Sequence, residues 1–108
     1  MKLNFNEIKR PTLEIVLNDE ERTELTLVTP QKYEVDKFMN TFQNLVNKNN
    51  SDITMDDVYQ CCAMLLSSNK EKIEITKEKV ESIFLIDDVI ALFQSYNAFI
   101  LGLYNSKN

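Results

Sequence analysis

Two pairs of neighbouring acids and one pair of neighbouring cysteines are the side chains in this 108-residue sequence that could do chemistry. The acids are Asp56-Asp57 and Asp87-Asp88, and the thiols are Cys61-Cys62. Two carboxylates that meet in space can act as a glycosidase pair or hold a metal, and a thiol with a lowered pKa can act as a nucleophile. The chain has no histidine. The commonest general base and the main nitrogen ligand of zinc are therefore missing.

Each of these pairs also has a structural explanation, which we favour. Successive residues on a helix point about 100° apart, so neither acidic pair can converge on one ion or one bond. Both acidic pairs stand at predicted helix starts, where carboxylates interact favourably with the helix dipole. The cysteines have no neighbouring base or positive charge, and cysteine is among the residue types most often buried. We therefore expect no catalytic, cofactor-binding or metal-binding residue, and no enzyme.

Length, composition and charge restrict the kind of protein further. Domains commonly hold about 100–150 residues, so residues 1–108 are predicted to form one domain. One glycine and two prolines leave long stretches that favour helices, and Gly102 alone cannot make a glycine-rich phosphate loop. The net charge of −5 argues against a nucleic-acid partner. Residues 1–7 lack the apolar run of a signal peptide, and polar residues interrupt the apolar stretch 83–103, so we expect no membrane span and a cytoplasmic location.

Residues 12–28 predict a β-hairpin. The two strands, at 12–17 and 23–28, alternate apolar and polar residues and are rich in β-branched side chains, with five polar residues between them. A lone two-stranded sheet is marginally stable unless it packs on something. Its edges could accept a strand from a second copy or from another protein, or the helices could protect them, and the sequence leaves both alternatives open.

The helical part is predicted at 29–104, which gives an α+β fold: an N-terminal hairpin followed by a small bundle of about four α-helices. Thr29-Pro30 is typical of a first helix start, with a hydroxyl N-cap before a proline at the first helical position. Residues 47–51 should end this helix. Thr54 and Asp57 predict a capping box for the second helix. The apolar stripe of the first helix is predicted to comprise Val35, Phe38, Met39, Phe42, Leu45 and Val46.

The last two helices are predicted to start at Thr76 and around Ile86, and the last should run to about Leu103. The final helix carries more apolar residues than the three in seven that one core-facing stripe requires. One row is predicted to face the core: Ile86, Val89, Ile90, Phe93, Asn97 and Ile100. The other row holds a tyrosine, which favours an interface, and is predicted to bind a partner: Leu92, Tyr96, Phe99 and Leu103. The alternative is that both rows are core.

The first thirteen residues, MKLNFNEIKRPTL, resemble the start of tail assembly chaperones from siphophages of Gram-positive bacteria. The pattern that follows is also similar to that family. A strand pair is followed by the Thr29-Pro30 helix start and by helices that end in Phe99-Ile100-Leu101-Gly102-Leu103. The resemblance covers nearly the whole chain. It rests on patterning rather than on residues with a chemical role, so no catalytic residue can be transferred.

The resemblance implies a non-catalytic binding protein. Members of this family coat the long tape measure protein, keep it soluble and help recruit tail-tube subunits around it. They leave as the tube polymerises, so we expect this protein in the host bacterial cytoplasm and not in the mature virion. We also expect it to self-associate, because the hairpin has edges that could accept a strand and the last helix has surplus apolar residues. Many members occur in two lengths through a ribosomal frameshift, and this chain would be the short form. The alternative function is a small acidic phage regulatory protein that binds one folded host target.

Overall fold

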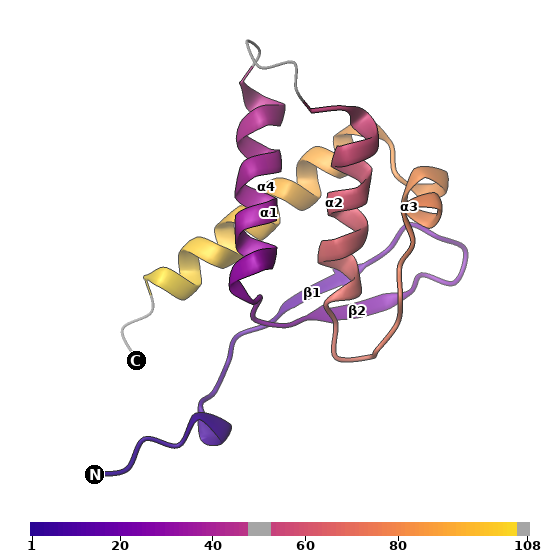
Figure 1. Ribbon diagram of the computed structural model, residues 1–108. Helices are drawn as coiled ribbons and strands as arrows, with labels where there is room; N and C mark the ends of the chain where they lie inside the picture. Colours follow the sequence, from indigo (N-terminus) through magenta and orange to yellow (C-terminus); the bar gives the residue numbers. More distant parts are fainter. Residues whose placement is uncertain (48–52, 106–108) are drawn as a thin grey trace.

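The computed structural model describes residues 1–47 and 53–105. A short 3-10 turn, η1 (Phe5–Glu7), precedes the two strands β1 (Leu13–Val16) and β2 (Glu24–Leu27). Four helices follow, namely α1 (Lys32–Val46), α2 (Met55–Ser67), α3 (Lys77–Ile83) and α4 (Ile86–Tyr104) (Figure 1). The predicted α+β class, with a hairpin before a small helical bundle, is confirmed.

The helix α2 lies at the centre of this arrangement. It contacts α1, α3, α4 and strand β2. Figure 1 shows α1 and α2 side by side, α4 crossing behind them, and the hairpin across one end of the helices. The buried residues of α2 are Val58, Cys61, Cys62, Ala63, Leu65 and Leu66.

The hairpin turns one face toward the helices. β1 and β2 run antiparallel, with Leu13 opposite Leu27 and Ile15 opposite Leu25. Leu25 and Leu27 are fully buried, and so is Leu17, which follows β1. Because alternate side chains of a strand point to opposite faces, these leucines all join the core from one face of the sheet. The hairpin is thus stabilised by its packing on the helices.

The carboxylate of Asp19 closes the turn between the two strands. It accepts hydrogen bonds from the backbone N–H of Thr23 at 2.8 Å and from the Thr23 hydroxyl at 2.6 Å. The Nζ of Lys79 in α3 lies 3.2 Å away, and the Asp19 side chain is only 3% exposed. The hydrogen bonds from Thr23, followed by the interaction with Lys79, hold the pKa of Asp19 well below its ordinary value of 3.8.

The predicted start of the first helix at Thr29-Pro30 is wrong by about two residues. The helix begins at Lys32 with Gln31 as its N-cap. The carboxylate of Glu34 accepts the backbone N–H of Gln31 at 3.0 Å. The capping bond from Glu34 thus fixes the start of α1 at Gln31, and the Thr29 hydroxyl is buried without a hydrogen-bond partner among the described residues.

The other predicted helix boundaries are confirmed. The Thr54 hydroxyl accepts the N–H of Asp57 at 3.2 Å, and the Asp57 carboxylate accepts the N–H of Thr54 at 3.0 Å. The hydroxyl of Thr76 accepts a backbone N–H in the first turn of α3. α1 ends before Asn47 as predicted, and the rest of the predicted terminating segment lies outside the described residues.

Asp19→Asn should lower the free energy of unfolding at pH 7, because the amide loses the charge that Thr23 and Lys79 stabilise. The folded-state pKa of Asp19 is lowered, so its contribution is complete above the ordinary value of 3.8 and is lost as the pH falls through the lowered pKa. Urea unfolding of both proteins should therefore show a smaller difference at pH 3 than at pH 7. An equal difference at the two pH values would contradict this role.

Candidate partner-binding surface

An aromatic cluster joins α4 to α1. The ring of Phe93 meets that of Phe38 edge to face at 5.4 Å between centroids, and Phe42 lies 5.9 Å from Phe93. The ring of Tyr96 lies 5.0 Å from Phe38 and 5.8 Å from Phe99. Such contacts are favourable because the positive edge of one ring meets the negative face of another. The cluster fixes which side of α4 turns inward.

The predicted partner-binding row is therefore wrong for two of its four residues. Leu92 and Tyr96 are 5% and 1% exposed, so neither is accessible to a partner in this fold. Phe99 and Leu103 are half-buried and stay candidates for binding. The tyrosine suggested an interface in the sequence, but its ring packs against Phe38 instead.

The predicted core row is also only partly correct. Val89, Phe93 and Ile100 are buried as expected. Ile86 and Ile90 are 56% and 44% exposed instead. Two exposed apolar residues further along the helix point to the same side, because residues three, four or eleven positions apart share one side of a helix. The two pairs are separated on that side by buried Phe93 and by polar Gln94 and Asn97. We call the two pairs together the outer stripe, and it comprises Ile86, Ile90, Leu101 and Tyr104.

Helix α4 is also the one helix in the described residues that is long and apolar enough to cross a membrane by length and composition. The sequence-based exclusion of a span within 83–103 was therefore too strong. In the structure, however, five residues of α4 are buried within the folded domain: Val89, Leu92, Phe93, Tyr96 and Ile100. One side of α4 thus packs in the core, while most of its residues are not buried.

The hydroxyl of Tyr96 is buried and has no hydrogen-bond partner in the described part of the chain. Burial raises the pKa of this phenol, and the nearby carboxylate of Glu34 raises it further. Glu34 is itself buried, with one carboxylate oxygen bonded to the N–H of Gln31. An unpaired buried hydroxyl costs about 1–3 kcal/mol. The ring of Tyr96 therefore stabilises the fold, and its hydroxyl does not.

The two cysteines occupy the core side of α2. Both thiols are free and fully buried. Burial raises the pKa of Cys61 to about 11 and that of Cys62 to about 12. Each thiol is therefore protonated at neutral pH, and the thiolate that acts as a nucleophile is not formed. The predicted packing role agrees with this placement.

The two acidic pairs do not converge. Asp57 caps α2, and Asp88 caps α4 by accepting the backbone N–H of Leu85 at 2.8 Å. Asp56 lies 3.2 Å from the Nζ of Lys77 and so links α2 to α3. Within residues 1–47 and 53–105, no three potential metal ligands come together.

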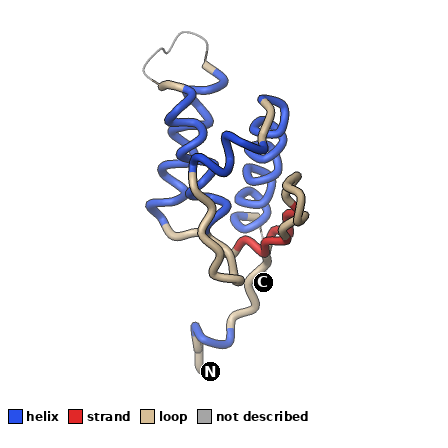
Figure 2. Tube along the Cα trace, turned by 90° about the vertical axis from the view of Figure 1, so that its right-hand side faces the viewer, coloured by secondary structure: helices blue, strands red, loops and turns tan. Residues whose placement is uncertain are grey.

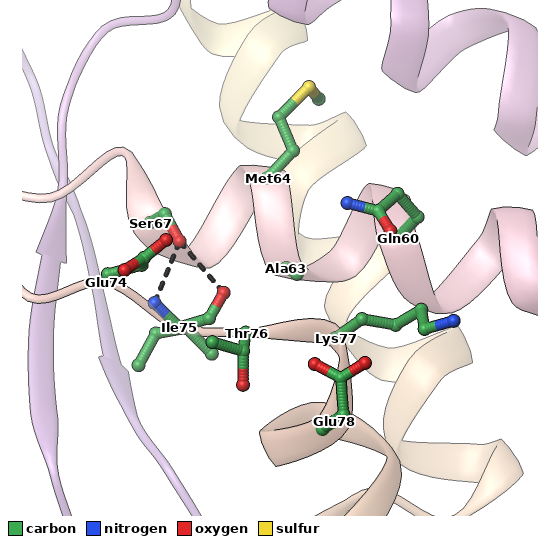
Figure 3. A pocket seen from close by; sticks show the side chains of 9 residues that line it. All are labelled: Gln60, Ala63, Met64, Ser67, Glu74, Ile75, Thr76, Lys77 and Glu78. Carbon is green, nitrogen blue, oxygen red and sulfur yellow. Dashed lines mark hydrogen bonds between the residues drawn. The ribbon is translucent and has the colours of Figure 1, made fainter.

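A pocket between α2 and the segment that leads into α3 has polar walls (Figure 3). The Ser67 hydroxyl donates to the carbonyl of Ile75 at 3.0 Å and accepts the N–H of Ile75 at 2.9 Å. Lys77, which lies on the same side of the pocket as Ile75, is paired with Asp56. These polar groups hold the segment against α2, which indicates a structural contact between elements.

The outer edge of β2 is covered by the segment that follows α2. The backbone N–H of Thr26 donates to the carboxylate of Glu71 at 2.8 Å, and the Thr26 hydroxyl donates to the same carboxylate at 2.7 Å. The carbonyl of Thr26 accepts the N–H of Lys70 at 2.9 Å. This edge of the hairpin is closed to any further strand.

The outer edge of β1 is open. The N–H of Leu17 donates to the carbonyl of Thr23 in the hairpin. Backbone groups of an antiparallel pair alternate, so those of Glu14 and Val16 point away from β2. No hydrogen bond from the described residues reaches them. The β2 edge is thus protected within the chain, whereas the β1 edge stays open.

Comparison with protein-family models, with curated proteins and with solved structures finds no match for this chain.

Tyr96→Phe should leave the free energy of unfolding unchanged or raise it by about 1 kcal/mol, because it removes a buried hydroxyl without a partner. Tyr96→Ala should lower it by about 3–5 kcal/mol, because the lost ring leaves a cavity beside Phe38. Urea unfolding of the three proteins measures both effects. Destabilisation by Tyr96→Phe of more than about 1 kcal/mol would show that the hydroxyl has a partner.

Proposed function

We propose that this protein is a phage tail assembly chaperone that binds the tape measure protein, keeps it soluble and helps recruit tail-tube subunits, without catalysis. The likeness of its sequence pattern to that family supports the identity. The observation that carries the proposal is the outer stripe of α4. Four large apolar side chains, 44% to 74% exposed, lie along one side of the most apolar helix in the described residues.

The geometry of the outer stripe suits a helical client. The outer stripe consists of two apolar pairs, Ile86 with Ile90 and Leu101 with Tyr104, which point to the same side of α4 and can each pack against side-chain rows of a second helix. Burial of a large apolar side chain contributes about 1.5–3 kcal/mol, and association costs offset much of the sum. One copy should therefore bind a client weakly, and several copies along a long client should bind it well. Weak individual contacts also allow the copies to leave during tube polymerisation.

The net charge supports the same proposal. The chain carries 17 acidic and 12 basic side chains, for a net charge of −5. Copies that coat a client through their apolar stripe would present this charge to solvent, and mutual repulsion would keep separate complexes from aggregating. A chaperone for an insoluble client needs both properties.

Ile90→Ser combined with Leu101→Ser should abolish the solubilisation of a co-expressed tape measure protein. Each change should weaken client binding by about 1–3 kcal/mol, because each removes an exposed apolar contact of the outer stripe. The fold should stay intact, since both side chains are about half exposed. The measurement is the soluble fraction of client, with circular dichroism of the variant as a check of folding.

Val46→Ser is the matched control, because Val46 is 62% exposed on α1, contrary to its predicted place in the apolar stripe of that helix, and lies outside the outer stripe. It should leave the client soluble. A client that stays insoluble with the unmodified protein would contradict the proposal, as would a client that the double variant solubilises equally well. Isolation of a one-to-one complex with a compact host protein instead would favour the alternative regulatory function.

A further inference from the structure

The first twelve residues form an arm that leaves the folded body (Figures 1 and 2). Hydrogen bonds of residues 1–11 join the arm only to itself within the described chain. The Asn4 amide donates to the Glu7 carboxylate at 3.1 Å, and the Arg10 guanidinium donates to the Phe5 carbonyl at 3.2 Å. Leu3 and Phe5 are both exposed. The arm therefore carries apolar side chains that its own body does not cover.

The sequence of the arm has the pattern of a strand, whereas in the single copy Phe5 and Asn6 lie in the 3-10 turn η1. Over residues 1–6, apolar side chains at positions 1, 3 and 5 alternate with polar side chains at positions 2, 4 and 6. This period of two is typical of a strand with one buried face. A single strand cannot satisfy its backbone groups or bury that face unaided.

The open edge of β1 borders an apolar groove. The hairpin and α4 form its two sides, and small side chains of α4, Ala91 and Ser95, leave room between them. Val16 at this edge is exposed. The complete lining consists of Ile15, Val16, Leu17, Asn18, Phe84, Asp88, Ala91, Leu92 and Ser95. The groove thus offers free backbone groups along one side and apolar surface along its floor.

The charges of the arm and the body are opposite in sign. Residues 1–12 hold three basic and one acidic side chain, and the rest of the chain holds nine basic and sixteen acidic side chains. Near the groove, Glu14 of β1 and Asp87 in the first turn of α4 are exposed acids. Complementary charges steer association and disfavour incorrect partners.

We propose that the turn η1 unwinds on association and that residues 1–6 of one copy add as a third strand to the open edge of β1 in a second copy, with Met1, Leu3 and Phe5 over the groove. The arm does not reach its own β1 edge, because Pro11 fixes its backbone and biases Arg10 to an extended conformation just before β1. The arm must instead continue away from the sheet. This assembly requires no client, so a test of it can fail or succeed whether or not the proposed function is correct.

Charge reversal tests the pairing of arm and groove. Lys2→Glu with Lys9→Glu reverses the arm, and Glu14→Lys with Asp87→Lys reverses the groove, while the capping acid Asp88 is kept. Sedimentation over a concentration series should show that the unmodified protein self-associates. Each variant alone should self-associate at least about tenfold more weakly. An equal mixture of the two variants should associate again, because each arm then meets a complementary groove.

Three outcomes of that experiment would overturn the proposal. They are a strictly monomeric unmodified protein, an arm variant that associates as strongly as the unmodified protein, and a mixture that does not recover association. Circular dichroism of each variant confirms folding, and all four substituted side chains are exposed.

Cross-linking locates the contact. Copies carrying Phe5→Cys, mixed with copies carrying Ala91→Cys, should form a mixed disulfide under mild oxidation. The native thiols are buried and protonated, so they contribute little background. Copies carrying Val46→Cys, on α1, are the control and should cross-link far less. Equal yields at positions 91 and 46, or no mixed disulfide at all, would overturn the proposal.

Discussion

The burial of α2 on several sides is the constraint on which the rest of the structure depends. Its apolar stripe reaches α1, α3, α4 and β2, so every element beyond the arm and β1 is positioned against this one helix. The hairpin is too small to be stable unaided, and Leu25 and Leu27 become buried only because the helices cover them. The segment that leaves α2 then bonds to β2 through Lys70 and Glu71. One central helix thus organises the core and closes one edge of the sheet.

Local signals in the sequence predicted the helices and strands well. The features that they did not predict depend on contacts between segments distant in the sequence. Capping by Thr54 and Thr76 depends on residues three positions away, so the sequence alone indicates both helix starts. The Glu34 cap was equally local, but the stronger Thr29-Pro30 pattern masked it. Helical periodicity shows that α4 has two apolar sides but not which side meets Phe38 of α1. The bond from Thr26 to Glu71 joins residues 45 positions apart, and no local pattern indicates it.

The two proposed surfaces of α4 lie on different sides of the helix. The outer stripe includes Ile86 and Ile90, whereas Ala91 and Ser95 face the groove beside β1. At about 100° per residue the mean directions of these two sets differ by roughly 140°. A client on the stripe and an arm in the groove would therefore not compete for space. Copies joined through their arms would present their stripes repeatedly, and binding of one copy would raise the effective concentration of the next.

The short helix α3 is connected to other elements by ion pairs. Seven residues are too few for a helix to be stable in isolation, and Val80 is the one residue of α3 that is buried in the core. Lys77 pairs with Asp56 of α2, and Lys79 pairs with Asp19 in the hairpin turn, so α3 adds a second link between α2 and the hairpin. Dissolved ions screen the pair of Lys77 with exposed Asp56, but they screen the pair of Lys79 with Asp19, whose side chain is only 3% exposed, much less. Raised salt should therefore weaken the link of α3 to α2 more than its link to the hairpin turn.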